Sequence, residues 1–389
     1  MIKVLHLLEA TLGGTRRHVI DLLKGIYRSN DNEIEIHFGY SLQRADSNFK
    51  PELEQIEANR IKCFECNMSR SINPVNDIKM VIQVVRYIKE NKINIVHAHS
   101  AKAGYVGRLA AKLVPGTRSI YTPNSSPFRL STLYHFLEIV AGWSLSDAII
   151  AVSESEKREL IKNKISSANK VYIVNSGIPE TEYEPQLNSQ VQDKDNSVLS
   201  VGTAGRITAQ KAPHRFVEIA EAVVKIVPNV RFIWIGDGEL RDDLEELIDR
   251  KGLSNNISVT GWIKEVDRAL LQLDVFLLAS DYESFGYVTV EAMRASLPCI
   301  VSDVSGSRDV VKNGETGFAI DKSNIDEYVY YLTKLLHDAK LRESMGKAGR
   351  ERWKKEFQAA QMVSNTLEVY RQVLKSPQSL VSEYTKAIF

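Results

Sequence analysis

Short apolar runs alternate along this chain with longer segments in which apolar residues recur every three or four positions. In the first half the runs cover residues 3–8, 33–40, 60–65, 93–97, 118–122, 148–152 and 171–174. In the second half they cover residues 198–202, 231–236, 257–260, 275–279, 299–302 and 317–319. Runs such as 148–152 are apolar at every position, which is typical of parallel strands buried on both faces. The pattern therefore predicts an α/β protein with parallel sheets covered by helices.

Helical periodicity separates these strands, and one polar stretch interrupts the alternation. The helical segments include 15–27, 75–91, 103–113, 132–146, 154–162, 214–224, 288–295 and 359–374. Residues 179–196 are rich in acids and glutamines and show no apolar period, which indicates a linker. We therefore predict two doubly wound domains, at 1–180 and 197–358, joined by a linker at 181–196.

The composition is that of a globular protein of the cell interior. The 50 Lys and Arg residues nearly balance the 49 Asp and Glu residues, which argues against broad binding of nucleic acid. The 3 cysteines indicate a reducing compartment without a disulfide framework. There is no run of about 18 apolar residues, and the first apolar run is too short for a secretory signal. We expect a cytoplasmic protein without a spanning helix.

The most informative chemistry lies at residues 283–291, where Glu283 and Glu291 flank an aromatic-glycine step. A strand precedes this segment and a helix follows it, so Glu283 is predicted in the loop and Glu291 inside the helix. The loop N–H groups and the helix N-terminus favour an anion, and the two carboxylates accept hydrogen bonds. A nucleotide sugar has this character, with phosphates in the middle and hydroxyls at both ends. The alternative is a helix start whose acids only complement the dipole.

A second polar cluster, at residues 205–211, carries the opposite charge. It contains Arg206 and Lys211, follows the strand at 198–202 and precedes the helix at 214–224. Open parallel sheets bind ligands at the carboxyl ends of their strands. The two clusters therefore predict one ligand site on the second domain.

The motifs of both halves resemble those of a known family. The second-half motifs are Gly205-Arg206 with Lys211, Gly236-Asp237-Gly238, Gly261-Trp262, Glu283 with Glu291, and Thr316-Gly317. The first-half motifs are Gly13-Gly14-Thr15, residues 96–100 (VHAHS) and residues 147–154 (DAIIAVSE). Together they resemble the family-4 retaining glycosyltransferases of the GT-B fold. The resemblance implies two Rossmann-like domains that face a cleft, with the last helix, at about 359–375, packed back on the first domain.

The resemblance also implies a role for each residue of the second-half site. Arg206, Lys211 and Glu283 are the catalytic candidates, because two cations stabilise the negative charge that grows on a leaving nucleoside diphosphate. Glu283 is placed near the transferred sugar and Glu291 at the ribose hydroxyls. The donor-binding candidates are Gly14, Gly205, Ser284, Phe285, Gly286, Tyr287 and Glu291. Gly286 suits a close approach of the backbone, since it lacks a Cβ.

Two residues of the first half are candidates for the acceptor and sugar side. His99 shares one face of a strand with His97, and a two-histidine metal site lacks a further ligand nearby in the sequence. The resemblance makes His99 a cleft residue, and a structural histidine is the alternative. Asn124 stands where many relatives have a histidine that contacts the transferred sugar. Asparagine still donates and accepts hydrogen bonds but does not titrate near neutral pH.

The resemblance implies a retaining, metal-independent glycosyltransferase. It would move a sugar from a nucleotide-diphosphate donor to a hydroxyl of a glycan or lipid-linked acceptor, in bacterial surface polysaccharide or glycolipid assembly. No cofactor and no metal are expected, and the leaving diphosphate would help to deprotonate the acceptor. The location implied is the inner face of the plasma membrane. The aromatic segment 127–137 is predicted as a packed helix, with a peripheral membrane contact as the alternative.

Two other functions remain open at this point. A sugar-nucleotide 2-epimerase of the same fold needs carboxylates placed for proton transfer and no acceptor. A non-catalytic nucleotide-sugar-binding assembly partner binds without turnover. Two short motifs have simpler explanations: Cys63 and Cys66 fall on a strand, and Asp193 with Asp195 falls in the linker.

Overall fold

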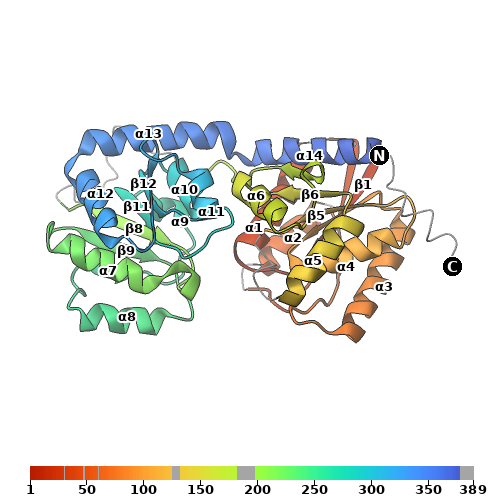
Figure 1. Cartoon of the computed structure of the whole chain (residues 1–389), viewed down its shortest axis with the longest axis horizontal. Helices are drawn as coiled ribbons and strands as arrows, with labels where there is room; N and C mark the ends of the chain where they lie inside the picture. The colour runs from red at the N-terminus through yellow and green to blue at the C-terminus, as the bar shows by residue number, and fades with distance from the viewer. Residues whose placement is uncertain (30, 47–48, 60, 125–131, 182–197, 377–389) are drawn as a thin grey trace. The chain divides into compact units, whose positions relative to one another are not determined.

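The chain forms two compact units, each a parallel sheet covered by helices (Figure 1). The computed structural model describes all residues except 30, 47–48, 60, 125–131, 182–197 and 377–389. Unit 1 comprises Met1–Pro179 with Ala359–Phe389, and unit 2 comprises Glu180–Gln358. The predicted α/β class with two doubly wound sheets is confirmed. Most of the predicted linker, and Asp193 with Asp195, lies outside the described residues.

Unit 1 is built on a seven-stranded sheet in the order β3-β2-β1-β4-β5-β6-β7, with every neighbouring pair parallel. The strands are β1 (Ile2–Leu8), β2 (Ile34–Tyr40), β3 (Lys62–Glu65), β4 (Ile95–His99), β5 (Arg118–Thr122), β6 (Ala148–Ala151) and β7 (Val171–Ile173). The helices are α1 (Gly13–Arg28), α2 (Phe49–Ala58), α3 (Pro74–Asn91), α4 (Ala101–Lys112), α5 (Thr132–Ser144), α6 (Glu154–Lys162) and α14 (Ala359–Lys375).

The side chains of β1 alternate between two hydrophobic layers, as the two-residue period of a strand requires. Val4 and Leu8 pack with α1, α2 and α14, whereas Leu5 and Leu7 pack with α3 and α4. The sheet is therefore covered on both faces, so the polar side chains that its central strands carry, such as His6 and His97, are buried as well.

Helix α14 comes from the far end of the chain and completes the core of unit 1. It buries Met362, Val363, Leu367, Tyr370 and Val373 and packs against α1. A Cβ added at Gly25 of α1 would lie 2.5 Å from Val363 Cγ2, so the absence of a side chain at Gly25 allows this close packing.

Unit 2 is built on a six-stranded parallel sheet in the order β10-β9-β8-β11-β12-β13. The strands are β8 (Ser200–Ala204), β9 (Arg231–Ile235), β10 (Ile257–Val259), β11 (Val275–Leu278), β12 (Cys299–Ser302) and β13 (Gly317–Ile320). The helices are α7 (Pro213–Val224), α8 (Arg241–Arg250), α9 (Val266–Leu270), α10 (Tyr287–Arg294), α11 (Ser305–Val310), α12 (Ile325–His337) and α13 (Ala339–Glu356).

Packing between α13 and α10 supplies a stability test for unit 2. A Cβ at Gly346 of α13 would lie 1.9 Å from the backbone oxygen of Ser296, whereas a Cβ at Gly349 would meet only Met293, at 3.4 Å. We expect Gly346→Ala to lower the free energy of unfolding of unit 2 by about 2 kcal/mol or more, because a backbone atom must move.

Gly349→Ala is the matched control, on the same helix and also buried. Its expected effect lies within about 1 kcal/mol, because alanine favours the helix and the contact is ordinary. Urea denaturation of both variants measures the difference. Equal unfolding free energies would show that α13 shifts freely over α10 and would contradict the packing described here.

Candidate functional site

The strand order of unit 2 reverses direction between β8 and β11, which are adjacent in the sheet. The chain leaves β8 toward β9 on one side and reaches β11 on the other, so the loops that follow these two strands diverge at the carboxyl edge. Ligands of doubly wound sheets bind at such a switch point. Both polar clusters predicted from the sequence lie on these two loops, because residue 205 follows β8 and residue 283 follows β11.

Charged and polar contacts join the two loops. Lys211 ends a 3₁₀ turn (Ala209–Lys211), and its Nζ lies 2.7 Å from Glu283 Oε1. Arg215, in the first turn of α7, lies 2.9 Å from Asp281 and donates to the Ala279 carbonyl at 2.6 Å. The backbone N–H of Asp281 also donates to the Gln210 carbonyl, at 2.8 Å. Lys211, Arg215, Asp281 and Glu283 therefore join the two loops into one polar surface, which we call the polar floor.

The Lys211–Glu283 pair lies at the centre of this floor and is largely shielded from solvent. The Lys211 side chain is 15% exposed and the Glu283 side chain 8%. An ammonium group has three donors, and Glu283 is the one acceptor that Lys211 contacts among the described residues. Two N–H bonds of Lys211 and one oxygen of Glu283 are therefore available to a ligand.

Arg206 has a different environment from Lys211. Its guanidinium lies 2.9 Å from Glu239, in the loop after β9, and the two side chains are 45% and 55% exposed. Such an exposed pair contributes little to stability and is easily exchanged for another anion. The structure thus places Arg206 on the β9 side of the floor and Lys211 on the β11 side, rather than next to each other.

The backbone of the second loop is held by two glycines. Gly286 caps α10 with φ +89°, and a Cβ there would be 3.5 Å from its nearest neighbour, so backbone conformation rather than close approach selects glycine. The close approach occurs at Gly306 instead, where a Cβ would lie 2.5 Å from the backbone nitrogen of Phe285. The Gly306 N–H also donates to the Glu283 carbonyl, at 3.0 Å. Sequence reasoning missed Gly306.

The remaining donor-side candidates surround this loop. Phe285 is buried and packs edge-on against Tyr287 and Phe357, with ring centroids 5.2 and 5.6 Å apart. Glu291 is buried on α10. Gly205 is fixed by two hydrogen bonds, from its N–H to the Ile235 carbonyl and from the Trp234 indole to its own carbonyl. The structure therefore brings Gly205, Lys211, Glu283, Ser284, Phe285, Gly286, Tyr287 and Glu291 to one edge of unit 2.

Three buried hydroxyls near this loop were not predicted. Ser280, Thr289 and Ser307 have side-chain oxygens that are closed to solvent and have no hydrogen-bond partner in the described part of the chain. Buried hydroxyls normally find a partner, so these three are candidates for contacts with a polar ligand or bound water. Ser280 alone has a sequence signal, because it closely follows the predicted strand at 275–279. Thr289 and Ser307 have none.

Unit 1 has its own switch point, between β1 and β4. Gly14 lies in the first turn of α1 after β1, His99 ends β4, and Asn124 follows β5, so the three candidates lie on one edge, after neighbouring strands of the sheet. Asn124 adopts φ +55°, and Ser100 adopts φ +69° with ψ 169°. Backbone of this kind in non-glycine residues costs about 1–3 kcal/mol and gathers at functional sites.

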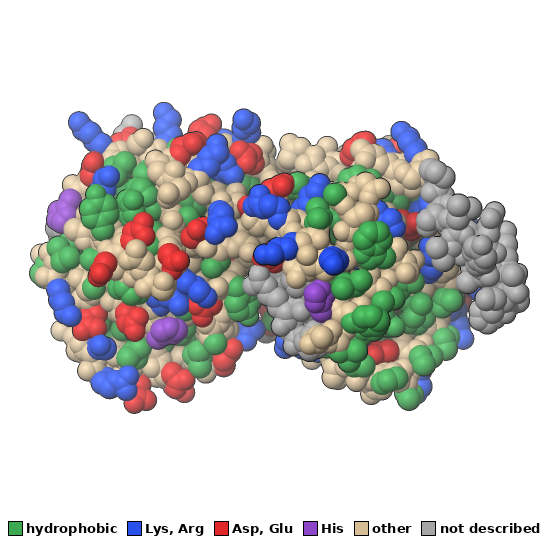
Figure 2. Space-filling view, in the orientation of Figure 1, with side chains coloured by type: hydrophobic (Ala, Val, Ile, Leu, Met, Phe, Trp, Pro, Cys, Tyr) green, Lys and Arg blue, Asp and Glu red, His purple; other side chains and the backbone are tan. Residues whose placement is uncertain are grey.

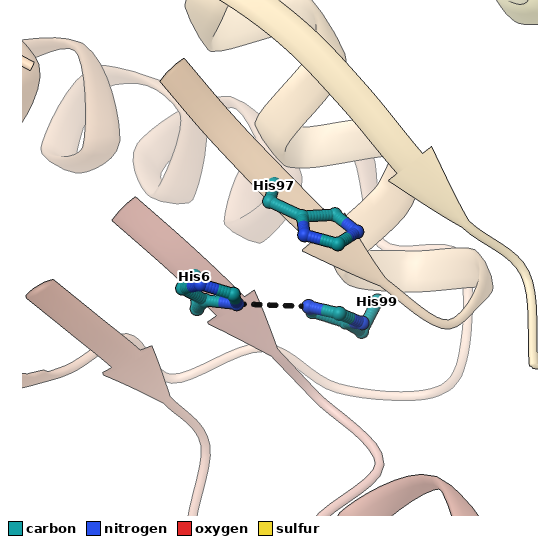
Figure 3. A group of neighbouring side chains, drawn as sticks. All are labelled: His6, His97 and His99. Atoms are coloured by element: carbon teal, nitrogen blue, oxygen red, sulfur yellow. Dashed lines mark hydrogen bonds between the residues drawn. The ribbon is translucent and has the colours of Figure 1, made fainter. Parts of the chain in front are cut away.

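His99 does not lie on the surface of unit 1 but in a buried network of histidines (Figure 3). Its Nε2 is 3.1 Å from Nδ1 of His6, and the two rings point edge to edge at each other. His97 is bonded on both nitrogens, to Tyr370 at 2.6 Å and to Thr122 at 2.8 Å, and Tyr370 also reaches His6 at 3.3 Å. Only Nδ1 of His99 has no partner among the described atoms.

No further ligand lies near His97 and His99 along the sequence, but the fold brings His6 of the neighbouring strand β1 beside them. The ligand nitrogens of the three residues all lie within 4.8 Å of one another. A bound metal would have to replace the His6–His99 hydrogen bond and one of the two bonds of His97, and its ligands would need to converge at about 2.0–2.1 Å. The geometry therefore fits a hydrogen-bonded network better than a metal site.

Burial keeps these rings uncharged. Loss of solvent, together with the nearby His18, lowers the pKa of His6 from 6.5 to about 3, and loss of solvent lowers the pKa of His18 to about 4. The same burial, with the neighbouring histidines, holds the pKa values of His97 and His99 well below 6.5. His18 lies beside the network, with its ring centroid 5.6 Å from that of His99.

Cys63 and Cys66 behave as core side chains. Both thiols are free, and burial raises the pKa of each to about 12. A reactive thiol needs a lowered pKa, so this pair lacks the electrostatics of a redox motif.

Both units of the chain match known sequence families. The sequence model described as "Glycosyl transferases group 1" matches residues 186–352, and that of "Glycosyltransferase Family 4" matches residues 12–182. The chain is 30% identical to the capsular polysaccharide biosynthesis glycosyltransferase CapM of Staphylococcus aureus over 327 residues, which are 79% of this chain and 84% of CapM. The chain belongs to glycosyltransferase family 4.

A second relative and two solved structures agree with this assignment. The UDP-Gal:alpha-D-GlcNAc-diphosphoundecaprenol alpha-1,3-galactosyltransferase of Escherichia coli is 27% identical over 90% of this chain and 95% of its own length. Anabaena Alr3699/HepE, in complex with UDP and glucose, matches 96% of this chain and 100% of its own with a TM-score of 0.80 at 20% identity. A glycosyltransferase from Rickettsia africae ESF-5 matches 97% and 99% with a TM-score of 0.78 at 19% identity. The fold is GT-B, as predicted.

The histidine network predicts an acid-sensitive unit 1. The unfolded chain binds a proton at each histidine near pH 6.5, whereas the folded unit binds none until the pH falls to about 4 or below at His18 and His6. The free energy of unfolding of unit 1 is therefore independent of these histidines above about pH 6.5. Below that pH it declines by about 1.4 kcal/mol per pH unit for each buried histidine.

Hydrogen exchange of unit 1 peptides in urea, from about pH 7.5 to 5, measures this slope. In the unaltered chain His18 Nδ1 lies 3.0 Å from Ser176 Oγ, and His18→Asn retains a side chain that can make this hydrogen bond. The variant should reduce the slope by the contribution of one proton, about 1.4 kcal/mol per pH unit. The exposed His214→Asn is the control and should leave it unchanged. An unaltered slope in His18→Asn would contradict the assignment of a neutral buried ring.

Proposed function

We propose that this glycosyltransferase transfers a sugar, with retention of configuration and without a metal, from a nucleotide-diphosphate donor to an acceptor hydroxyl. The observation that carries the proposal is the Lys211–Glu283 pair at the switch point of unit 2, with two donors of Lys211 still open. The pair supplies a cation for the departing diphosphate and, 2.7 Å away, an acceptor for a sugar hydroxyl.

The electrostatics of the floor suit a leaving group that gains charge. As the sugar–phosphate bond breaks, negative charge grows on the diphosphate, and Lys211 is already fixed by Glu283 and needs little reorganisation. Arg206 exchanges its exposed contact with Glu239 for the phosphate. The donor's ribose hydroxyls are assigned to Glu291, and its phosphates to the N–H groups of residues 284–287 and to Gly14 of unit 1.

Unit 1 contributes the acceptor side of the proposal. Asn124, at the end of β5, has a side chain that can donate and accept hydrogen bonds near the transferred sugar. The fully buried His99 acts from beneath this edge and positions it, rather than contacting substrate. The acceptor hydroxyl then attacks on the face that the diphosphate leaves, and the diphosphate takes its proton.

The substrate class follows from the named relatives. The E. coli relative uses UDP-Gal and a diphosphoundecaprenol-linked sugar, and the S. aureus relative serves capsular polysaccharide biosynthesis. We infer a nucleotide-diphosphate sugar donor and a glycan or lipid-linked acceptor in bacterial surface polysaccharide or glycolipid assembly.

Donor binding tests the proposal first. Melting curves with UDP, GDP, ADP and their sugars, with and without EDTA, should show a shift for one nucleotide that EDTA does not change. A ligand at 100 times its dissociation constant stabilises by about 2.7 kcal/mol, which is readily measured. No shift with any nucleotide would overturn the proposal. Conversion of donor without an acceptor would indicate an epimerase, and affinity without turnover a binding protein.

Removal of Lys211 tests the catalytic assignment. Lys211→Ala should lower kcat/KM by about 10²–10³-fold, as loss of one preorganised charge does in other enzymes. Glu283→Gln, which keeps size and polarity, should lower it as well. Lys251→Ala is the control. It removes a cation that follows α8 and pairs with Glu221 of α7. Equal activity of Lys211→Ala and Lys251→Ala would remove Lys211 from the mechanism.

Asn124→Gly tests the acceptor side without disturbing the backbone. Glycine adopts φ +55° freely, so the loop should keep its shape while the amide is lost. Turnover should fall roughly tenfold, which corresponds to one hydrogen bond of about 1.4 kcal/mol, with an unchanged donor melting shift. The anomeric configuration of the product, read by NMR, decides between retention and inversion.

A further inference from the structure

The buried histidines of unit 1 lie in one continuous series of hydrogen bonds that has an open end. The series runs from Oγ1 of Thr122 through both nitrogens of His97 to the hydroxyl of Tyr370. It continues from that hydroxyl to Nε2 of His6, and from Nδ1 of His6 to Nε2 of His99 (Figure 3). Nδ1 of His99 has no partner among the described residues and is the open end. These five residues are the histidine network.

The histidine network is closed to solvent and carries no net charge. Its residues are at most 1% exposed, so the purple patches on the surface in Figure 2 belong to histidines outside it. Burial lowers the pKa values of its three histidines and raises the pKa of Tyr370, so each ring is neutral and the hydroxyl keeps its proton. A contact then holds only where one atom brings a proton and the other a lone pair. Each proton therefore determines the position of the next one.

Two arrangements of protons satisfy all of these contacts. In the first, Tyr370 donates to Nδ1 of His97, and the Nε2–H of His6 donates to Tyr370. Nδ1 of His6 is then bare and accepts from the Nε2–H of His99. All three rings carry their proton on Nε2, and the open end is a lone pair. In the second arrangement every proton is reversed, all three rings carry it on Nδ1, and the open end is an N–H donor.

The lengths of the two contacts of Tyr370 select the first arrangement. Hydroxyl donors form shorter hydrogen bonds, of about 2.5–3.0 Å, than N–H donors, which form bonds of about 2.7–3.2 Å. The 2.6 Å between Tyr370 and Nδ1 of His97 is too short for an N–H donor, so the Tyr370 hydroxyl donates there. Its one proton is then used, and the longer contact of 3.3 Å is the N–H of His6 donating to Tyr370.

The histidine network ends beneath the residues assigned to the acceptor. His99 of β4 is paired with Thr122 of β5 in the sheet. The Thr122 carbonyl accepts hydrogen bonds from the Ser100 N–H at 3.2 Å and from the Asn124 amide at 3.5 Å. Ser100 and Asn124 both adopt positive φ, which persists only where the surrounding structure holds it. Thr122 therefore joins the network, through its hydroxyl, to the strained backbone of this edge.

We propose that Thr122 and Tyr370 are positioning residues for the acceptor side of the transfer. Tyr370 fixes the arrangement of protons, and the Thr122 hydroxyl accepts the Nε2–H of His97 at 2.8 Å. Because this bond fixes the Thr122 side chain, the Thr122 carbonyl keeps its contacts with Ser100 and Asn124. The effect on turnover rests on the proposed function, since it acts through Asn124. The arrangement of protons does not depend on that function.

The positions of the protons test the proposal first. In the full chain labelled with 15N at its 8 histidines, a nitrogen that carries a proton and a bare nitrogen give clearly different NMR shifts. Variants with one histidine replaced by glutamine assign the signals. We expect the proton of His6, His97 and His99 on Nε2. A proton on Nδ1 of any of the three would overturn the arrangement.

Thr122→Val should reverse the histidine network. Valine has a similar size but no hydroxyl, so the Nε2–H of His97 would be buried without an acceptor, which costs more than a bare nitrogen. The protons should therefore move to Nδ1, and the change should reach His99 at the far end. Thr122→Ser keeps the hydroxyl and should keep every proton on Nε2. Unchanged shifts of His99 in folded Thr122→Val would show that the network does not couple its two ends.

Tyr370→Phe tests the coupling itself, because it interrupts the network between its two halves. When Thr122→Val is added to Tyr370→Phe, the shifts of His99 should no longer respond to the loss of the Thr122 hydroxyl. The exposed His214 and His337 are internal references and should respond to none of these changes. A response of His99 that survives Tyr370→Phe would contradict the role of Tyr370.

Acceptor kinetics test the positioning role. Thr122→Val should lower kcat/KM for the acceptor by roughly twofold to tenfold, the range of one hydrogen bond, with an unchanged nucleotide melting shift. Thr122→Ser should retain the activity of the unaltered chain. In the Asn124→Gly background Thr122→Val should have little further effect, because the amide that Thr122 positions is gone.

Two outcomes separate the positioning role from the proposed function. An equal loss of activity from Thr122→Val with and without Asn124→Gly would show that Thr122 does not act through Asn124, and would overturn the positioning role. Protons on Nε2 in a chain without any nucleotide melting shift would reject the proposed function and leave the arrangement of the histidine network standing.

Discussion

The reversal of strand order next to β1 and β8 is the constraint on which both units depend. A parallel sheet must be covered on both faces, so helices return the chain to the same edge before each new strand. Where the order reverses, two loops leave adjacent strands in opposite directions and no helix closes the gap. Lys211 with Glu283 in unit 2, and Gly14 with His99 in unit 1, lie at these gaps because of topology rather than local sequence.

The two units use these gaps in opposite ways. Unit 2 gathers charges that pair across its loops yet keep open donors, and leaves the hydroxyls of Ser280, Thr289 and Ser307 unpaired within the described structure. In unit 1 neutral histidines lie buried below the switch point, where Tyr370 of α14 bonds to His97 and His6. The first arrangement suits an anionic ligand, and the second gives a rigid support beneath Asn124 and the strained Ser100.

The sequence predicted the fold far better than the details of the site. Each of the thirteen predicted strands has a counterpart close to its predicted range in the described part of the chain, and runs such as 148–152 were clearest because a strand buried on both faces leaves a nearly continuous apolar signal. Helix α2 was missed because it buries only Phe49, Leu53 and Ile56. His6 was missed because its partners are 91 and 93 positions away, and Gly306 because its contact with Phe285 exists only in the folded loop. Long-range contacts of this kind leave no local pattern.

Helix α14 also sets the order in which the chain can fold as it is synthesised. Unit 2 is continuous from residue 180 to 358, so it can complete its core as soon as that stretch has left the ribosome. Unit 1 needs Met362, Leu367, Tyr370 and Val373, so its core and histidine network close only after unit 2 has been made. Until then the part of unit 1 synthesised first, residues 1–179, exposes the apolar surface that α14 covers, and this surface stays open to aggregation for as long as the synthesis of unit 2 takes.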